Sequence, residues 1–119
     1  MLVSSCVYAQ DTSQFNGEWM ARYDNASDEG QQVKLTIADQ GGSWHAYRGG
    51  KRNPCVRRDI PISVERKSSS EILVQVKAAD FLQGCPNSTL SLTLIAPDKL
   101  EGSFVTSAIP VAFKKHQNQ

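Results

Sequence analysis

The sequence predicts an all-β fold, an antiparallel β-barrel of about eight strands, and two observations carry that prediction. Apolar and polar residues alternate from Gly17 almost to the end of the chain, which is the pattern of strands with one buried face. Short turn-forming segments interrupt the alternation at close intervals, as they do in barrels and sandwiches. A barrel is favoured because closure removes exposed sheet edges, and a β-sandwich is the alternative.

The first three strands are predicted by three alternating runs. The run at 15–23, "FNGEWMARY", places four side chains on one face: Phe15, Trp19, Ala21 and Tyr23. The same face is continued in 31–40 and 43–48 by Val33, Leu35, Ile37, Trp44 and Ala46. Between the last two runs, Asp39 to Gly42 predict a turn in which the glycines accept a positive φ, so 31–48 is expected to form a hairpin.

Five further strands are predicted in the second half of the chain. Their inward residues are expected to be Ile60, Ile62, Val64, Ile72, Val74, Val76, Leu90, Leu92 and Leu94, followed by the apolar residues of 100–105 and 109–113. Turns are predicted at 68–70 and 96–99, the second with a proline where type I turns favour it. The segment 78–88, "AADFLQGCPNS", breaks the alternation and predicts a short helical turn.

Length and charge limit the number of domains and the class of partner. A chain of 119 residues with 39% hydrophobic residues suffices for one domain with one core, expected over 14–116 and as a monomer. Its formal net charge of +1 is not the strongly basic balance of a nucleic-acid-binding protein, so no nucleic-acid partner is expected.

The segment 1–13 is interpreted as the remnant of a signal peptide or as a disordered N-terminus. Its apolar and small residues end at Ala9, where the small side chains that signal peptidase reads are expected. The chain is therefore predicted to be periplasmic or secreted. An alternative is that Cys6 follows a degenerate lipobox and carries a lipid, which would anchor the protein to a membrane.

Two cysteines remain outside that segment, Cys55 and Cys85. An even number of cysteines in an exported chain predicts one disulfide, which stabilises by roughly 3 to 4 kcal/mol in the chain-entropy model. The alternative is a pair of free thiols in a cytosolic protein. Neither cysteine belongs to a Cys-x-x-Cys pair, and neither His45 nor His116 flanks one, so no metal site is predicted.

The stretch "FNGEW" resembles the Gly-x-Trp signature with which calycin-type barrels, such as lipocalins, avidins and small bacterial barrel inhibitors, begin their first strand. The resemblance implies that Trp19 closes one end of the barrel as a plug. It also implies a basic neighbour from the last strand, which is assigned to Lys114, with Lys115 as the alternative, through a cation–π contact of about 0.5 to 2 kcal/mol. The residues themselves predict a buried ring at Trp19 whatever the family.

The one uneven charge feature is "RGGKRNPCVRR" at 48–58. Its cations are the candidate binding residues: Arg48, Lys51, Arg52, Arg57 and Arg58. Guanidinium groups beside a Gly-Gly pair suit a carboxylate, sulfate or phosphate, so an anionic polymer or a protein is the predicted partner. The alternative is a solvated loop.

No catalytic residue and no cofactor are predicted. His45 and His116 have no Ser or Cys near them in a recognised nucleophile motif, and Asp24, Asp28 and Glu29 lack the spacing of a calcium loop. We therefore expect a binding module, such as an inhibitor, that acts through loops at the barrel rim. A carrier of a small ligand inside the barrel is the first alternative and an enzyme the second. Bulky inward aromatic residues favour the rim over the interior.

Overall fold

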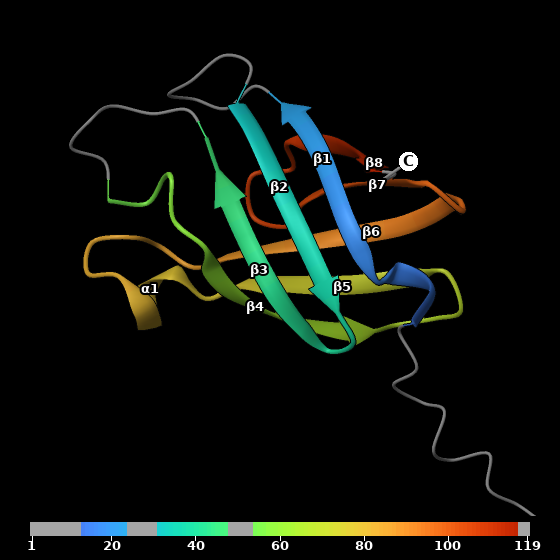
Figure 1. The fold of residues 1–119 in the computed structure, drawn as a ribbon, viewed down its shortest axis with the longest axis horizontal. Helices are drawn as coiled ribbons and strands as arrows, with labels where there is room; N and C mark the ends of the chain where they lie inside the picture. The colour runs from blue at the N-terminus through green and yellow to red at the C-terminus, as the bar shows by residue number, and fades with distance from the viewer. Residues whose placement is uncertain (1–12, 24–30, 48–53, 117–119) are drawn as a thin grey trace, which may run out of the picture.

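The protein forms a closed antiparallel β-barrel in a computed structural model, which describes residues 13–23, 31–47 and 54–116. Every strand pairs with the next along the chain, and β1 pairs with β8 to close the barrel. The strands are β1 (Gly17–Tyr23), β2 (Gln31–Ala38), β3 (Gly41–Ala46), β4 (Ile60–Arg66), β5 (Glu71–Val76), β6 (Ser88–Ala96), β7 (Lys99–Phe104) and β8 (Pro110–Lys115). In Figure 1, β1, β2 and β3 cross in front of the more nearly horizontal β5 and β6. The barrel is confirmed and the sandwich alternative is wrong.

The described residues also include two short helical segments. The 3₁₀ turn η2 (Ser13–Phe15) precedes β1, and the single α-helical turn α1 (Ala78–Phe81) lies between β5 and β6, where the sequence predicts one. Neither of these two described helical segments has the length and apolar character needed to cross a membrane. Of the segment 1–13, the structure describes only Ser13, whose carbonyl accepts a hydrogen bond from the Asn16 N–H at 3.1 Å.

The register aligns the predicted apolar rows in the barrel interior. Trp19 lies opposite Leu35, and Leu35 lies opposite Trp44, so that three buried side chains meet across β1, β2 and β3. The rings of Phe104 and Phe113 lie 6.1 and 6.3 Å from that of Trp44. Alternation of inward and outward side chains therefore fills this part of the barrel with its own residues.

The two ends of the barrel differ in how the strands are connected. At one end, here the turn end, the connections are tight turns at 39–40, 67–70 and 97–98. At the other, here the loop end, the connections are the longer segments 24–30, 47–59, 77–87 and 105–109. In Figure 1 the η2 turn, in blue, lies at the turn end and α1 lies at the loop end.

The turn between β2 and β3 differs from the expectation in which residue has the positive φ. Asp39, the first turn residue, has a φ of 60°, and Gly42 has its φ of 138° inside β3. A Cβ on Gly42 would lie 1.9 Å from the Thr36 carbonyl oxygen of the neighbouring strand. Gly42 is thus required by close strand approach rather than by the turn itself.

Candidate functional site

The turn end is closed by Trp19, as the Gly-x-Trp resemblance implies. Its side chain is fully buried, and its indole Nε1–H donates a hydrogen bond of 2.8 Å to the carbonyl oxygen of Phe15 in η2. The ammonium of Lys115 lies 5.1 Å from the centroid of the Trp19 ring. Phe15, Trp19 and Lys115 together form what we call the plug.

The assignment of Lys114 to the plug is wrong, and its neighbour Lys115 occupies the place. Phe113 is buried, and because side chains alternate along a strand, Lys115 faces inward with it while Lys114 faces solvent. The register agrees, since Lys115 lies opposite Trp19 and Lys114 lies opposite Met20.

The glycine of the Gly-x-Trp motif, Gly17, is required by its contact with Lys115. A Cβ on Gly17 would lie 3.0 Å from Lys115 Cε, and the φ of Gly17 is 132°, a conformation that L side chains rarely adopt. The absence of a side chain therefore lets the aliphatic stem of Lys115 cross the first strand and bring its ammonium to the Trp19 ring.

Side chains beside η2 tie the tight turns to the plug. The Asn16 amide Nδ2–H donates to Asp39 Oδ1 at 3.2 Å, and the Asp39 N–H donates to Asn16 Oδ1 at 2.7 Å. The Gln14 side-chain amide donates to the carbonyl of Ser69 in the 67–70 turn. At this end the Trp19 ring is buried and the side chains of Asn16, Asp39 and Gln14 are hydrogen-bonded, so these groups stabilise the fold.

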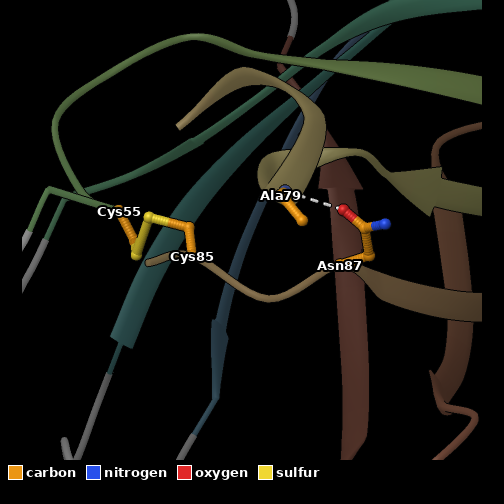
Figure 2. Close-up of a disulfide and its surroundings, with 4 residues drawn as sticks. All are labelled: Cys55, Ala79, Cys85 and Asn87. Carbon is orange, nitrogen blue, oxygen red and sulfur yellow. Dashed lines mark hydrogen bonds between the residues drawn. A yellow bond between two sulfur atoms is a disulfide. The ribbon is translucent and has the colours of Figure 1, made fainter. Parts of the chain in front are cut away.

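The loop end is cross-linked by the predicted disulfide between Cys55 and Cys85. The Cα atoms of the two cysteines are 5.7 Å apart, and the bond joins connection 47–59 to connection 77–87. Figure 2 shows Asn87 beyond Cys85 on the same connection, with its side-chain oxygen accepting a hydrogen bond of 2.8 Å from the Ala79 N–H in α1. Two of the loop-end connections are thereby fixed to one another.

The described part of the basic segment begins beside this disulfide. Arg57 and Arg58 are exposed, whereas Val56 between them and Cys55 is buried in the core. Arg57 has a φ of 60°, and its N–H donates a 2.6 Å hydrogen bond to the Ala46 carbonyl at the end of β3. The other three candidates, Arg48, Lys51 and Arg52, lie outside the described residues.

A pair that sequence reasoning missed holds the end of this segment to the barrel wall. His45 Nδ1 lies 2.9 Å from Asp59 Oδ1, and the His45 ring lies 4.7 Å from that of Tyr47. The alternation of β3 places His45 on its outer face, but its contact with a residue beyond a long connection depends on how that connection returns. No local signal in the sequence carries that information.

Exposed apolar side chains are unevenly divided between the two ends. The described residues include four large apolar side chains that are exposed: Tyr47, Phe81, Ile95 and Val105. Three of them belong to loop-end connections, and Ile95 lies near the end of β6 at the turn end. Sequence reasoning did not single out Phe81, although the break in alternation around it was visible.

An open pocket of about 680 Å³ lies on the outer wall and is lined by residues of β1, β6, β7 and β8. Arg22 and Glu101 contribute opposite charges to it, and Ile95 and Ala112 contribute apolar surface. Among the residues that the structure describes, no group of three or more His, Cys, Asp or Glu side chains is placed to hold a metal ion. Arg57 and Arg58 are the two of the five predicted binding residues that the structure describes.

Comparisons with known proteins support the fold alone. No protein-family profile matches the chain, and no curated protein matches its sequence. A solved structure of a redesigned β-barrel is similar, with a TM-score of 0.50 and 15% sequence identity over 92% of this chain and 97% of that one. At this identity the likeness extends to the barrel and to nothing more specific, so membership of the calycin group stays a prediction.

Proposed function

We propose that this protein is an exported binding module that uses its loop end, chiefly residues 48–58, to hold an anionic partner. One observation carries the proposal: Arg57 and Arg58 are exposed close after the disulfide-bonded Cys55, where the Arg57 N–H donates a hydrogen bond to the Ala46 carbonyl at the end of β3. Guanidinium groups form strong, charge-assisted hydrogen bonds with carboxylate, sulfate and phosphate. A segment that is already held in place loses less conformational entropy when it binds.

The filled interior favours the loop end over a ligand carried inside the barrel. Trp19, Trp44 and Phe113 are buried there, and the half-buried rings of Tyr23 and Phe104 lie 5.1 Å apart. A carrier needs interior volume that these side chains occupy. Inhibition of another protein through the rim belongs to the same proposal, since it would use the same surface.

Export is part of the proposal because disulfides persist in oxidising compartments. Cys55 and Cys85 are bonded, which suits a periplasmic or secreted protein better than a cytosolic one. In the chain-entropy model a bond across a sequence separation of 30 stabilises by roughly 3 to 4 kcal/mol. A small barrel outside the cell gains stability from such a bond.

The test uses two polyanions of different chemistry, poly-L-glutamate and dextran sulfate. Binding is measured by titration calorimetry at several salt concentrations for the wild type and for a variant with Lys51, Arg52, Arg57 and Arg58 replaced by serine. The matched control removes the same number of cations from exposed positions elsewhere: Arg22, Lys67, Lys99 and Lys114. Both variants have the same net charge, so any difference between them reports position.

We expect wild-type binding to weaken as salt rises, because exposed charges are screened over a Debye length of about 8 Å at physiological ionic strength. The 51–58 variant should lose most of the binding and most of the salt dependence, whereas the control should retain the majority of both. Equal losses in the two variants would mean that binding follows net charge, and the loop end would then have no special role.

A further inference from the structure

Phe81 is a large aromatic side chain that the fold leaves in solvent. It is 52% exposed at the end of α1, on the connection that the disulfide holds. Resting on the proposed function, we infer that Phe81 is an anchor that packs against apolar side chains of an acidic protein segment, and that carboxylates flanking these side chains meet Arg57 and Arg58. The partner is then an acidic protein segment with apolar side chains rather than a uniformly charged polymer.

The exposure of Phe81 follows from how the single helical turn packs. Ala78 is buried, and Leu82, four residues later, is half-buried against the core, so these two residues form the inward side of the turn. The remaining positions, Ala79, Asp80 and Phe81, are exposed. Side chains at these positions make few contacts with the core. A polar residue in place of Phe81 would therefore allow folding equally well.

The backbone that carries Phe81 is held from both sides. Before it, the Lys77 N–H donates to the Pro61 carbonyl at 3.0 Å, which fixes the connection to the start of β4. After it, the Leu82 N–H donates to the Ala78 carbonyl at 2.7 Å and the Cys85 N–H to the Leu82 carbonyl at 3.3 Å. The disulfide and the bond from Ala79 to Asn87 complete the frame (Figure 2).

A backbone held in this way presents the apolar area of Phe81 before a partner arrives. The entropy of ordering the segment is lost on folding, so it does not weaken binding. Protein interfaces concentrate their binding energy on such fixed aromatic and arginine side chains. Loop-end residue Val105, 54% exposed, adds apolar area on a third connection, where its N–H donates to the Thr89 carbonyl at 2.8 Å.

The disulfide links the connection that carries the arginines to the connection that carries Phe81. Arg57 is two residues after Cys55, and Phe81 is four residues before Cys85, so short spans of chain join each of them to the cross-link. Carboxylate Asp80 beside the ring is the one acidic group of α1, and it disfavours an evenly acidic partner at that point. A complementary partner therefore places apolar side chains against Phe81 and carboxylates against Arg57 and Arg58.

Two synthetic peptides of equal length and equal charge test the inference. In the first, glutamates flank leucine and phenylalanine residues, and in the second the same glutamates flank serines. Affinities are measured by titration calorimetry for the wild type, Phe81→Ala, Phe81→Leu and the matched control Ile95→Ala. Ile95 is 51% exposed at the turn end, so its replacement removes a comparably exposed apolar side chain from the other end.

We expect the wild type to bind the apolar acidic peptide about tenfold more tightly than the serine peptide, and Phe81→Ala to abolish that difference. Phe81→Leu and Ile95→Ala should keep most of it. Melting temperatures near that of the wild type show that the variants are folded, since Phe81 contributes little to the core.

Equal wild-type affinity for both peptides, or an Ile95→Ala effect as large as that of Phe81→Ala, would overturn the inference. If both peptides still bind and both lose affinity when the four basic residues of 51–58 are replaced, the anionic preference stands without the anchor. If neither peptide and neither polyanion binds, the proposed function fails as well.

Discussion

The two ends of this barrel are both held firmly, but by different means and with different surfaces left over. At the turn end, hydrogen bonds of the Asn16 and Gln14 side chains join two of the tight turns to the segment around η2, and the buried Trp19 indole donates to the Phe15 carbonyl. At the loop end one disulfide joins two long connections and leaves arginines and large apolar side chains in solvent. The cross-link joins Cys55 to Cys85, and Arg57, Arg58 and Phe81 on the two joined connections are exposed.

The two ends also differ in how a residue with a strained backbone is compensated. Asp39 at the turn end and Ala108 at the loop end both have a φ of 60°, which is unfavourable for residues with a Cβ. Asp39 gains hydrogen bonds with Asn16 in that conformation. Ala108 has no side chain that could do the same, and strain without local compensation is typical of segments that serve a function.

The largest expected effect is at the plug. Trp19→Ala removes a fully buried indole and its bond to the Phe15 carbonyl, and large-to-small changes of this kind cost about 3 to 5 kcal/mol. Chemical denaturation should show that loss in the free energy of unfolding. A loss below about 1 kcal/mol would mean that the plug does not make a large contribution to the stability of the barrel.

The next effect in size is at the disulfide. Replacing Cys55 and Cys85 by serine should lower the free energy of unfolding by about 2 to 4 kcal/mol. Amide hydrogen exchange should then accelerate in 54–59 and 77–87 more than at the turn end, because the cross-link joins only those two connections. Equal acceleration at both ends would contradict the division between them. Alkylation of both thiols in the unreduced wild type would contradict the bond itself.

A smaller effect separates the two adjacent lysines. Lys115→Met keeps the aliphatic stem over Gly17 but removes the ammonium from the Trp19 ring, and should cost about 0.5 to 2 kcal/mol. Lys114→Met is the control on the outer face and should change stability by less than about 0.5 kcal/mol. The same denaturation experiment measures both, and equal losses would remove the cation–π contact from the account.

The smallest effects compare two of the residues with a positive φ, Asp39 and Ala108. Ala108→Gly should raise the free energy of unfolding by about 0.5 to 1 kcal/mol, since glycine adopts a positive φ without penalty. Asp39→Gly relieves the same strain but loses the carboxylate that accepts from Asn16, so we expect no gain. Thermal and chemical denaturation check both, and a gain at Asp39 as large as that at Ala108 would contradict the compensation.

The strands were predictable because alternation is a local signal that survives folding. The inward row of Val33, Leu35 and Ile37 could be identified from the sequence, and all three residues are buried. Lys115 could also have been chosen over Lys114, since it stands two residues after Phe113 and therefore shares its face. The alternation of side chains along the strand therefore predicts Lys115, and the assignment to Lys114 did not follow it.

Other features could not be predicted because they depend on distant parts of the chain. The contact between His45 and Asp59 requires the path of the whole connection between β3 and β4. The exposure of Phe81 depends on how α1 packs against the barrel, and its helical turn is too short to show a period. For the candidate site, the sequence identified the charges of 48–58 and the disulfide but not the apolar side chains beside them.

The central claim is that the loop end binds the anionic partner and that the turn end stabilises the barrel. The most direct test is to titrate isotopically labelled protein with poly-L-glutamate and to follow every assigned backbone amide by NMR. The account predicts that chemical-shift changes centre on 54–59, which holds Arg57 and Arg58, and that none occur at 39–40 or 97–98. Changes centred on the tight turns, or on Arg22 and the outer-wall pocket around it, would contradict the claim.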